Sequence, residues 1–148
     1  MARLPNVTRG PVTLSRIDYA ENLSQETYAF IAVIAIDGKT SLVRNEGCGG
    51  PNHIREHAVS ALVEAHAATL PPEAGLRMSA DFLVSLMMGD ALEKRDLLKM
   101  KKKGYTHRVA LGDGLELYVV AKDEAAARAR VAQGKHASKA ATATITAL

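Results

Sequence analysis

The sequence predicts an α+β fold: an antiparallel sheet, made of a meander and a C-terminal hairpin, with two central helices packed on it and a C-terminal helix. Three observations support this prediction. Strand-like and helix-like segments come in separate blocks along the chain rather than in strict alternation. Two pairs of apolar segments are each joined by a short turn that contains Asp-Gly, which favours antiparallel hairpins. Between these pairs lie two segments with helical spacing of their apolar residues, separated by Pro71-Pro72.

The first half of the chain predicts the meander. Residues 1–10 contain Pro5 and Gly10 and no periodicity, so we expect an N-terminal arm or a peripheral strand. Residues 12–17 alternate apolar and polar side chains in part, which is typical of a half-buried strand. A longer apolar run covers 28–36, and Asp37-Gly38 joins it to 39–44, as in a type I′ hairpin.

The middle of the chain predicts two helices. Pro51 and Asn52 suit a helix entrance, and the first helix should end near Leu70 because a prolyl ring disrupts a helix interior. Ser79 is a candidate N-cap for a second helix, with Asp81 in its first turn and an end near Met100.

The last third predicts a hairpin of 105–111 and 115–121, joined by Gly112-Asp113-Gly114. Asp123 then starts an alanine-rich helix that Gly134 ends. Residues 135–148 form a small-residue tail, and the sequence leaves open whether it is ordered or flexible.

Length and composition predict one soluble domain over residues 1–148. The chain has 47% apolar and 24% charged residues, which is unlike disordered proteins, and no apolar run is long enough for a membrane span. No apolar stretch near Met1 suggests a signal peptide, and a lone Cys48 allows no intrachain disulfide. We therefore expect a cytoplasmic protein without membrane partners. The two apolar helices exceed what a small sheet covers, which predicts a homo-oligomer, a dimer or higher.

The segment from Asn45 to His53 contains three glycines, at 47, 49 and 50. Glycines allow successive N–H groups to converge on an anion, and the start of a helix would add positive potential. The segment is neither a dinucleotide fingerprint nor a Walker loop. It therefore predicts either a phosphate site of another kind or a tight turn between a strand and a helix.

Basic residues concentrate in 94–108, where seven lysines and arginines stand against one acid. The net charge of this segment, +6, exceeds the net charge of the whole chain, +3. Part of it stabilises the C-terminal end of a helix. The rest predicts an anion-binding surface, and Tyr105 and His107 add rings that could stack on bases.

A metal site is a further alternative. Cys48, His53 and His57 follow a C-x4-H-x3-H spacing, and histidines four residues apart share a helix face. A fourth ligand is lacking unless His66 or a partner chain supplies it, and Glu56 as a general base lacks a second catalytic group. We therefore expect no metal, no cofactor and no enzymatic activity.

The residues Ile36-Asp37-Gly38-Lys39, followed by the Asn45-x-Gly47-x-Gly49-Gly50-x-Asn52 pattern, resemble a group of small phage-encoded proteins. The layout of the chain also resembles that of the Thoeris anti-defence sponges, which sequester cyclic ADP-ribose-type signals and, in some members, cyclic oligonucleotides. The chain departs from the group's pattern at Glu46, where the group tends to have Asp. The resemblance implies binding without turnover in the cytoplasm of an infected bacterial host. It also implies roles for the loop residues and, as phosphate partners, for Arg95 and Arg108.

The first prediction is thus a non-catalytic sponge for a small phosphorylated nucleotide. Its expected ligand-binding residues are Asn45, Gly47, Gly49, Gly50, Asn52, His53, Arg95, Lys99, Lys103 and Arg108. The alternatives are a nucleic-acid-binding protein that uses residues 94–108, with strongly salt-dependent affinity, and a metal-dependent enzyme built on Cys48, His53 and His57.

Overall fold

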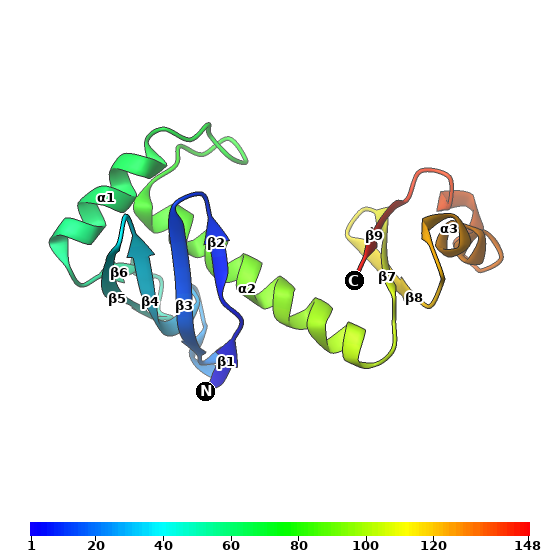
Figure 1. The fold of residues 1–148 in the computed structure, drawn as a ribbon, viewed down its shortest axis with the longest axis horizontal. Helices are drawn as coiled ribbons and strands as arrows, with labels where there is room; N and C mark the ends of the chain where they lie inside the picture. Colours follow the sequence, from blue (N-terminus) through cyan, green and yellow to red (C-terminus); the bar gives the residue numbers. More distant parts are fainter. The chain divides into compact units, whose positions relative to one another are not determined.

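The computed structural model describes residues 1–148 and confirms an α+β fold with antiparallel sheets (Figure 1). The sequence predicted one domain, and the contacts form two compact units, Met1–Arg95 and Asp96–Leu148. Each unit has its own cluster of buried apolar residues. The long helix α2 (Ala80–Lys102) contributes residues to both units.

The first unit is built on a six-stranded sheet. Its strands are β1 (Ala2–Leu4), β2 (Val7–Arg9), β3 (Val12–Tyr19), β4 (Ala29–Ile36), β5 (Lys39–Glu46) and β6 (His53–Ile54), with a 3-10 turn η1 (Glu21–Leu23) between β3 and β4. All neighbours are antiparallel, and the expected arm at 1–10 pairs with β3 through β1 and β2. Asp37 and Gly38 have φ of 50° and 76°, as the predicted type I′ turn requires.

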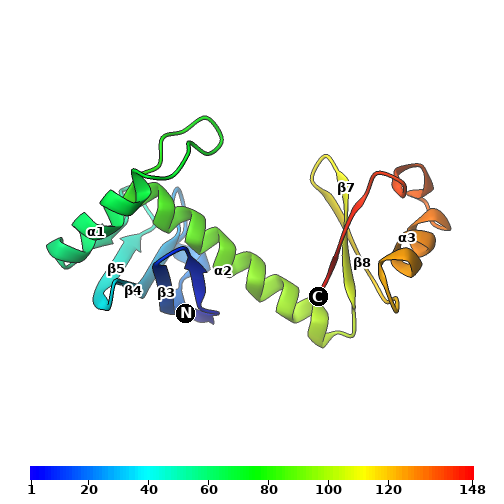
Figure 2. The ribbon, with the colours of Figure 1, turned by 45° about the horizontal axis from the view of Figure 1, so that its top comes forward.

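Two helices cover one face of this sheet. The helix α1 (His57–Ala67) packs against β4, β5 and β6, and the first part of α2 joins the same apolar cluster (Figure 2). In β4 every second residue, from Phe30 to Ile36, is buried in this cluster. The apolar helix faces from which we predicted an oligomer are therefore buried within the unit, and the oligomer stays a prediction.

The first helix begins five residues later than the sequence suggested. Pro51 and Asn52 precede β6, which pairs with β5, and α1 starts after Glu56, whose side chain makes no capping hydrogen bond. The pairing of Ile54 with Val43 buries Ile54, and this tertiary contact overrides the helical spacing of the segment. The second helix begins as predicted, because the Phe82 N–H donates to Ser79 Oγ at 3.1 Å.

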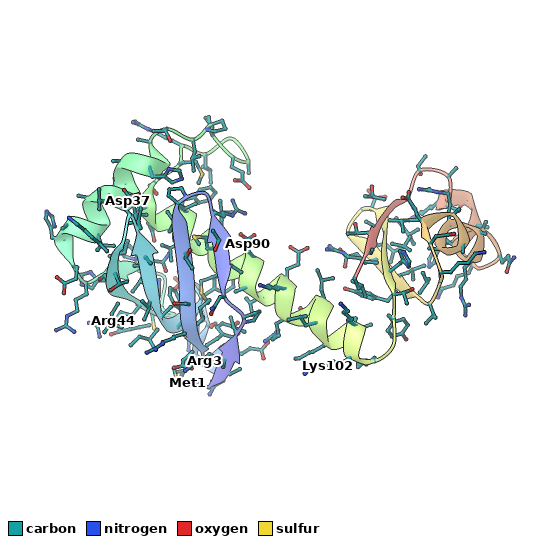
Figure 3. The ribbon with its side chains drawn as sticks, viewed as in Figure 1. Met1, Arg3, Asp37, Arg44, Asp90 and Lys102 are labelled. Atoms are coloured by element: carbon teal, nitrogen blue, oxygen red, sulfur yellow. The ribbon has the colours of Figure 1, made fainter.

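An ion pair ties the sheet to α2. Arg9 at the end of β2 donates to both carboxylate oxygens of Asp90, at 2.6 and 3.0 Å (Asp90 is labelled in Figure 3), and lies 3.5 Å from Glu73. The hydrogen bonds to Asp90 raise the pKa of Arg9 above its ordinary value.

The second unit contains a separate three-stranded sheet in the order β8-β7-β9. Its elements are β7 (His107–Gly112), β8 (Leu115–Val119), α3 (Glu124–Ala132), the 3-10 turn η2 (Ala137–Lys139) and β9 (Thr144–Ala147). The predicted hairpin and the Asp123 cap of α3 are present, the cap accepting from the Ala126 N–H at 2.8 Å. The tail at 135–148, whose order the sequence leaves open, supplies β9, which pairs with β7. Alternating Thr144, Ile145 and Thr146 suit a strand, since Ile145 packs on the small core.

Candidate functional site

The glycine loop after β5 is held together by its own side chains. The buried Asn45 amide accepts hydrogen bonds from Thr27 Oγ1 and from the Gly47 N–H, both at 2.8 Å. It donates to the Gly50 carbonyl at 2.9 Å and to Asn52 Oδ1 at 3.0 Å. Asn45 therefore organises the loop from within, and all four hydrogen bonds of its amide stay inside the chain.

Gly47 and Gly49 allow the loop to approach the segment 21–27 closely. The Gly47 carbonyl accepts from the N–H groups of Gln25 and Glu26, both at 3.0 Å. A Cβ on Gly47, at φ +89°, would overlap the Leu23 carbonyl oxygen, and a Cβ on Gly49, at φ +96°, would overlap the Glu26 carboxylate. The loop thus needs glycine at Gly47 for packing against backbone and for its positive φ, and at Gly49 for the positive φ, because the Glu26 side chain can move aside.

These contacts do not match the expected phosphate nest. The Gly47 and Gly49 N–H groups donate to Asn45 and Thr27, so they do not converge on an external anion. The Asn52 N–H donates to Asp81 Oδ1 at 2.7 Å, and the Asn52 amide donates to the Asp81 carbonyl and to Ser85 Oγ. The loop connects β5, the 21–27 segment and the start of α2 through hydrogen bonds. These contacts favour the second interpretation that the sequence allows, a structural turn.

The basic residues of the predicted site are divided between the two units. Arg95 lies in the first unit and lines a pocket with Met1, Tyr19 and Glu21. Lys99, Lys103 and Arg108 lie in the second unit, where Arg108 forms an ion pair with Glu116. The expectation that these residues join the glycine loop around one ligand therefore stays a prediction.

The metal alternative lacks the necessary cluster. Nowhere in residues 1–148 do three His, Cys, Asp or Glu side chains come close enough to hold a metal ion. His53 lies on β6 and His57 starts α1, so the two histidines are not four apart on one helix as the spacing suggested. Cys48 is exposed in the loop.

The face of the first sheet opposite the helices is uncovered and carries another group of residues. Paired residues of an antiparallel sheet lie on the same face, so the register gives two rows across the strands. The first row is Arg3, Asp18, Ile31, Arg44 and His53. The second row is Ser15, Val33 and Leu42. Arg55 continues this row, because its backbone N–H donates to the Leu42 carbonyl at 2.9 Å.

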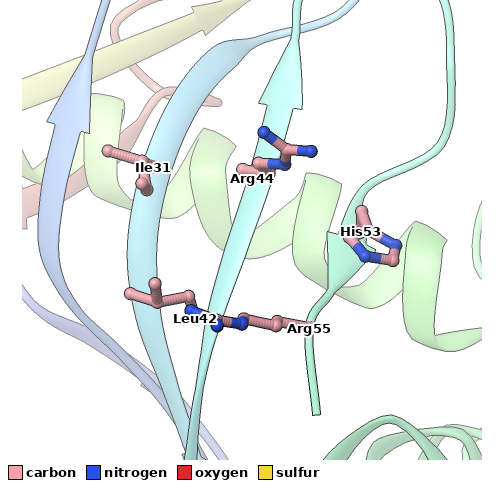
Figure 4. Close-up of a pocket in the computed structure, with 5 residues that line it drawn as sticks. All are labelled: Ile31, Leu42, Arg44, His53 and Arg55. Atoms are coloured by element: carbon pink, nitrogen blue, oxygen red, sulfur yellow. The ribbon is translucent and has the colours of Figure 1, made fainter. Parts of the chain in front are cut away.

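Five of these residues line a pocket of about 430 Å³: Ile31, Leu42, Arg44, His53 and Arg55. Figure 4 shows the Arg55 side chain reaching from the segment directly after β6 toward Leu42 on β5, with Arg44 on β5 and His53 on β6. Ile31 and Leu42 are 38% and 40% exposed, so the floor of the pocket is apolar and open to solvent. A smaller pocket of about 170 Å³ adjoins it at Arg44 and His53, lined also by Asn45, Glu46 and Gly50 of the loop.

The cations of this pocket have no acidic partner within the chain. Arg44 and Arg55 make no side-chain hydrogen bond or ion pair, whereas Arg3 in the same row is paired with Asp18 at 2.8 Å. Arg44 on β5 and Arg55, directly after β6, are diagonal neighbours, because Arg44 pairs with His53 two residues before Arg55. Diagonal neighbours of this kind have Cα atoms about 7–8 Å apart. Two long side chains at this spacing can direct both guanidinium groups at one phosphate. We call Arg44, His53 and Arg55, with Ile31 and Leu42, the open-face pocket.

Sequence reasoning missed most of this pocket, although it named His53. The alternation in 39–44 places Leu42 and Arg44 on the face opposite Val43, and that signal was present. The sequence predicts a helix after Pro51, and a helix there gives Arg55 no position on the sheet. Its outward position depends on the short strand β6, which only the pairing with β5 reveals.

None of the helices is both long enough and apolar enough to cross a bilayer. Comparisons with protein-family models, curated proteins and solved structures gave no match.

Proposed function

We propose that the first unit is a non-catalytic binding module for a small phosphorylated nucleotide, bound in the open-face pocket. One observation carries the proposal: two arginines without an acidic partner, Arg44 and Arg55, lie beside the exposed apolar floor of the pocket. The phosphate lies between the two guanidinium groups, and the base or ribose lies against Ile31 and Leu42. The pocket volume is within the range of small-ligand sites, about 300–1,000 Å³.

The glycine loop supports this site without donating to the phosphate. Its hydrogen bonds hold the end of β5 and the approach to β6, from which Arg44 and His53 project. The adjoining smaller pocket brings Asn45, Gly50 and His53 to the edge of the ligand site. The proposal thus keeps the ligand class expected from the sequence and moves the phosphate from the glycines to the two arginines.

The biological form of the proposal is sequestration without turnover, as the resemblance to the anti-defence sponges implies. A nucleotide signal held in this way would be recovered unchanged when the protein is denatured. Mass spectrometry of small molecules released from the purified protein tests this, and recovery of a cleaved product instead would contradict the non-catalytic part of the proposal.

Isothermal titration calorimetry tests the site itself. ADP, cyclic ADP-ribose and a cyclic dinucleotide are compared with adenosine, which lacks phosphate. We expect at least one phosphorylated ligand to bind more tightly than adenosine, and Arg44→Gln or Arg55→Gln to weaken it about tenfold or more, because a hydrogen bond to a charged group contributes about 1.5–3 kcal/mol. Arg77→Gln is the matched control, since Arg77 is exposed in the loop before α2 and lies outside the pocket. Equal loss in all three variants would contradict the proposal.

A further inference from the structure

The second unit carries a strong positive charge that the open-face pocket does not use. Residues 96–148 contain ten lysines and arginines and five acidic residues, which gives a net charge of +5. Residues 1–95 contain nine lysines and arginines and eleven acidic residues, which gives a net charge of −2. Basic charge is therefore concentrated in one unit. A surface of this kind attracts polyanions.

Lysines surround the end of α2 without acidic partners. Lys99, Lys102 and Lys103 are exposed and have no ion pair. Lys102 and Lys103 come three and four residues after Lys99, so both lie on the same side of the helix end as Lys99 (Lys102 is labelled in Figure 3). The helix C-terminus carries only about half an elementary charge, which one cation offsets. Three cations on one side exceed what the helix end requires.

A backbone turn brings aromatic rings next to these lysines. Gly104, at φ +96°, ends the helix; its N–H donates to the Lys101 carbonyl at 3.0 Å, and the Tyr105 N–H donates to the Met100 carbonyl at 3.3 Å. This Schellman arrangement reverses the chain directly after the lysines. Tyr105 then contacts Tyr118 of β8, with ring centroids 6.1 Å apart.

Tyr118 lies on the face of the second sheet that α3 does not cover. It pairs with Arg108, which pairs in turn with Thr146, so one row across the three strands presents a phenol ring, a guanidinium and a hydroxyl. The alternate residues His107 and Val109 are buried on the other side. This corrects the expectation that His107 is a stacking ring, and it leaves the two half-exposed tyrosines in that role.

We propose that the second unit binds single-stranded nucleic acid through Lys99, Lys102, Lys103, Tyr105 and Tyr118, which we call the lysine–tyrosine surface. The lysines neutralise backbone phosphates, and the tyrosine rings stack on unpaired bases. A duplex hides the faces of its bases, so the tyrosines distinguish a single strand from a duplex. The site lies wholly within residues 96–148 and is independent of the open-face pocket.

Fluorescence anisotropy tests this proposal with the full chain, a labelled 20-nucleotide oligothymidine and a duplex of the same length, at 50 and 200 mM NaCl. We expect the wild type to bind the single strand more tightly than the duplex, with affinity falling as salt rises. Replacing Lys99, Lys102 and Lys103 by glutamine should lower affinity for both probes and flatten the salt dependence.

The matched control replaces Lys122, Lys135 and Lys139 by glutamine, which removes the same charge from the same unit. An equal loss in both triple variants would reduce the effect to net charge and overturn the proposal. Absence of binding at 50 mM NaCl, or a preference for the duplex, would overturn it as well.

The tyrosines have their own test. Tyr118→Ala should weaken single-strand binding by about fivefold or more and leave the salt dependence unchanged, whereas Tyr118→Phe should retain binding, because a phenyl ring still stacks. Circular dichroism checks the fold of each variant, and Tyr105→Ala provides a second variant should Tyr118→Ala unfold. Equal binding by Tyr118→Ala and Tyr118→Phe, together with equal binding by Tyr105→Ala and Tyr105→Phe, would contradict stacking. Arg44→Gln and Arg55→Gln should leave this binding unchanged, which separates it from the nucleotide site.

Discussion

Single residues decide how the glycine loop is interpreted. The segment from Asn45 to His53 is compatible with both an anion nest and a structural turn, because glycine spacing alone does not show where the N–H groups point. The structure directs the Gly47 and Gly49 N–H groups to Asn45 and Thr27. The hydrogen bonds between the loop and residues 21–27 decide between the nest and the turn. Residues 21–27 contain no recognisable motif, so the sequence could not reveal these contacts.

A substitution at two of these glycines measures this structural role. Gly47→Ala should lower the free energy of unfolding by more than about 2 kcal/mol, because the backbone has positive φ and the methyl group would overlap the Leu23 carbonyl. Gly50→Ala should change it by less than about 0.5 kcal/mol, since a Cβ there meets nothing within 4 Å and φ is not positive. Urea unfolding followed by circular dichroism compares the two, and equal stability of the two variants would contradict the packing role.

At the scale of elements, local signals predicted most boundaries correctly. The Asp37-Gly38 turn, the Ser79 cap and the Asp123 cap are where the sequence predicts them, because each depends on the conformation and hydrogen bonds of residues within three positions of one another. Errors arose where distant pairing overrides local preference. The strand β6 lies where the sequence predicts the start of a helix, and the pairing of β9 with β7 orders a tail whose state the sequence leaves open.

Two salt bridges of the first unit, Arg9–Asp90 and Arg3–Asp18, should contribute differently to the free energy of unfolding. Asp90→Asn removes the charge that accepts two hydrogen bonds from Arg9, and both side chains are only about one-third exposed. We expect a loss of about 1 kcal/mol in the free energy of unfolding. Asp18→Asn, at the more exposed Arg3–Asp18 pair on the same sheet, should cost less than about 0.5 kcal/mol. Chemical denaturation measures both, and a larger loss at Asp18 would refute the ranking.

At the scale of the whole molecule, the sequence predicted the fold class but not the division into two units. Composition and length are compatible with one domain, and the basic segment was assigned to one site with the glycine loop. The boundary falls inside α2, between Arg95 and Asp96, where neither proline nor glycine interrupts the helix. A continuous helix conceals a division that only the two separate apolar clusters reveal.

The two clusters differ in size, which predicts different local stability. Twenty-two buried residues form the cluster of the first unit and five form that of the second. Amides of β7, β8 and β9 should therefore exchange with solvent faster than those of β3, β4 and β5. Hydrogen–deuterium exchange followed by mass spectrometry measures both sets in the full chain. Uniform protection across both sheets would mean that the units unfold together.

The central claim is that Arg44 and Arg55 hold one phosphate of the same ligand, and a double-mutant cycle tests it most directly. The dissociation constant of the tightest phosphorylated ligand is measured by calorimetry for the wild type, Arg44→Gln, Arg55→Gln and the double variant. If both arginines contact one phosphate, the two losses are coupled, and the double variant should differ from the sum of the single variants by about 0.5 kcal/mol or more. Strictly additive losses would place the two arginines on separate groups, and unchanged affinity in all variants would contradict the open-face pocket as the binding site.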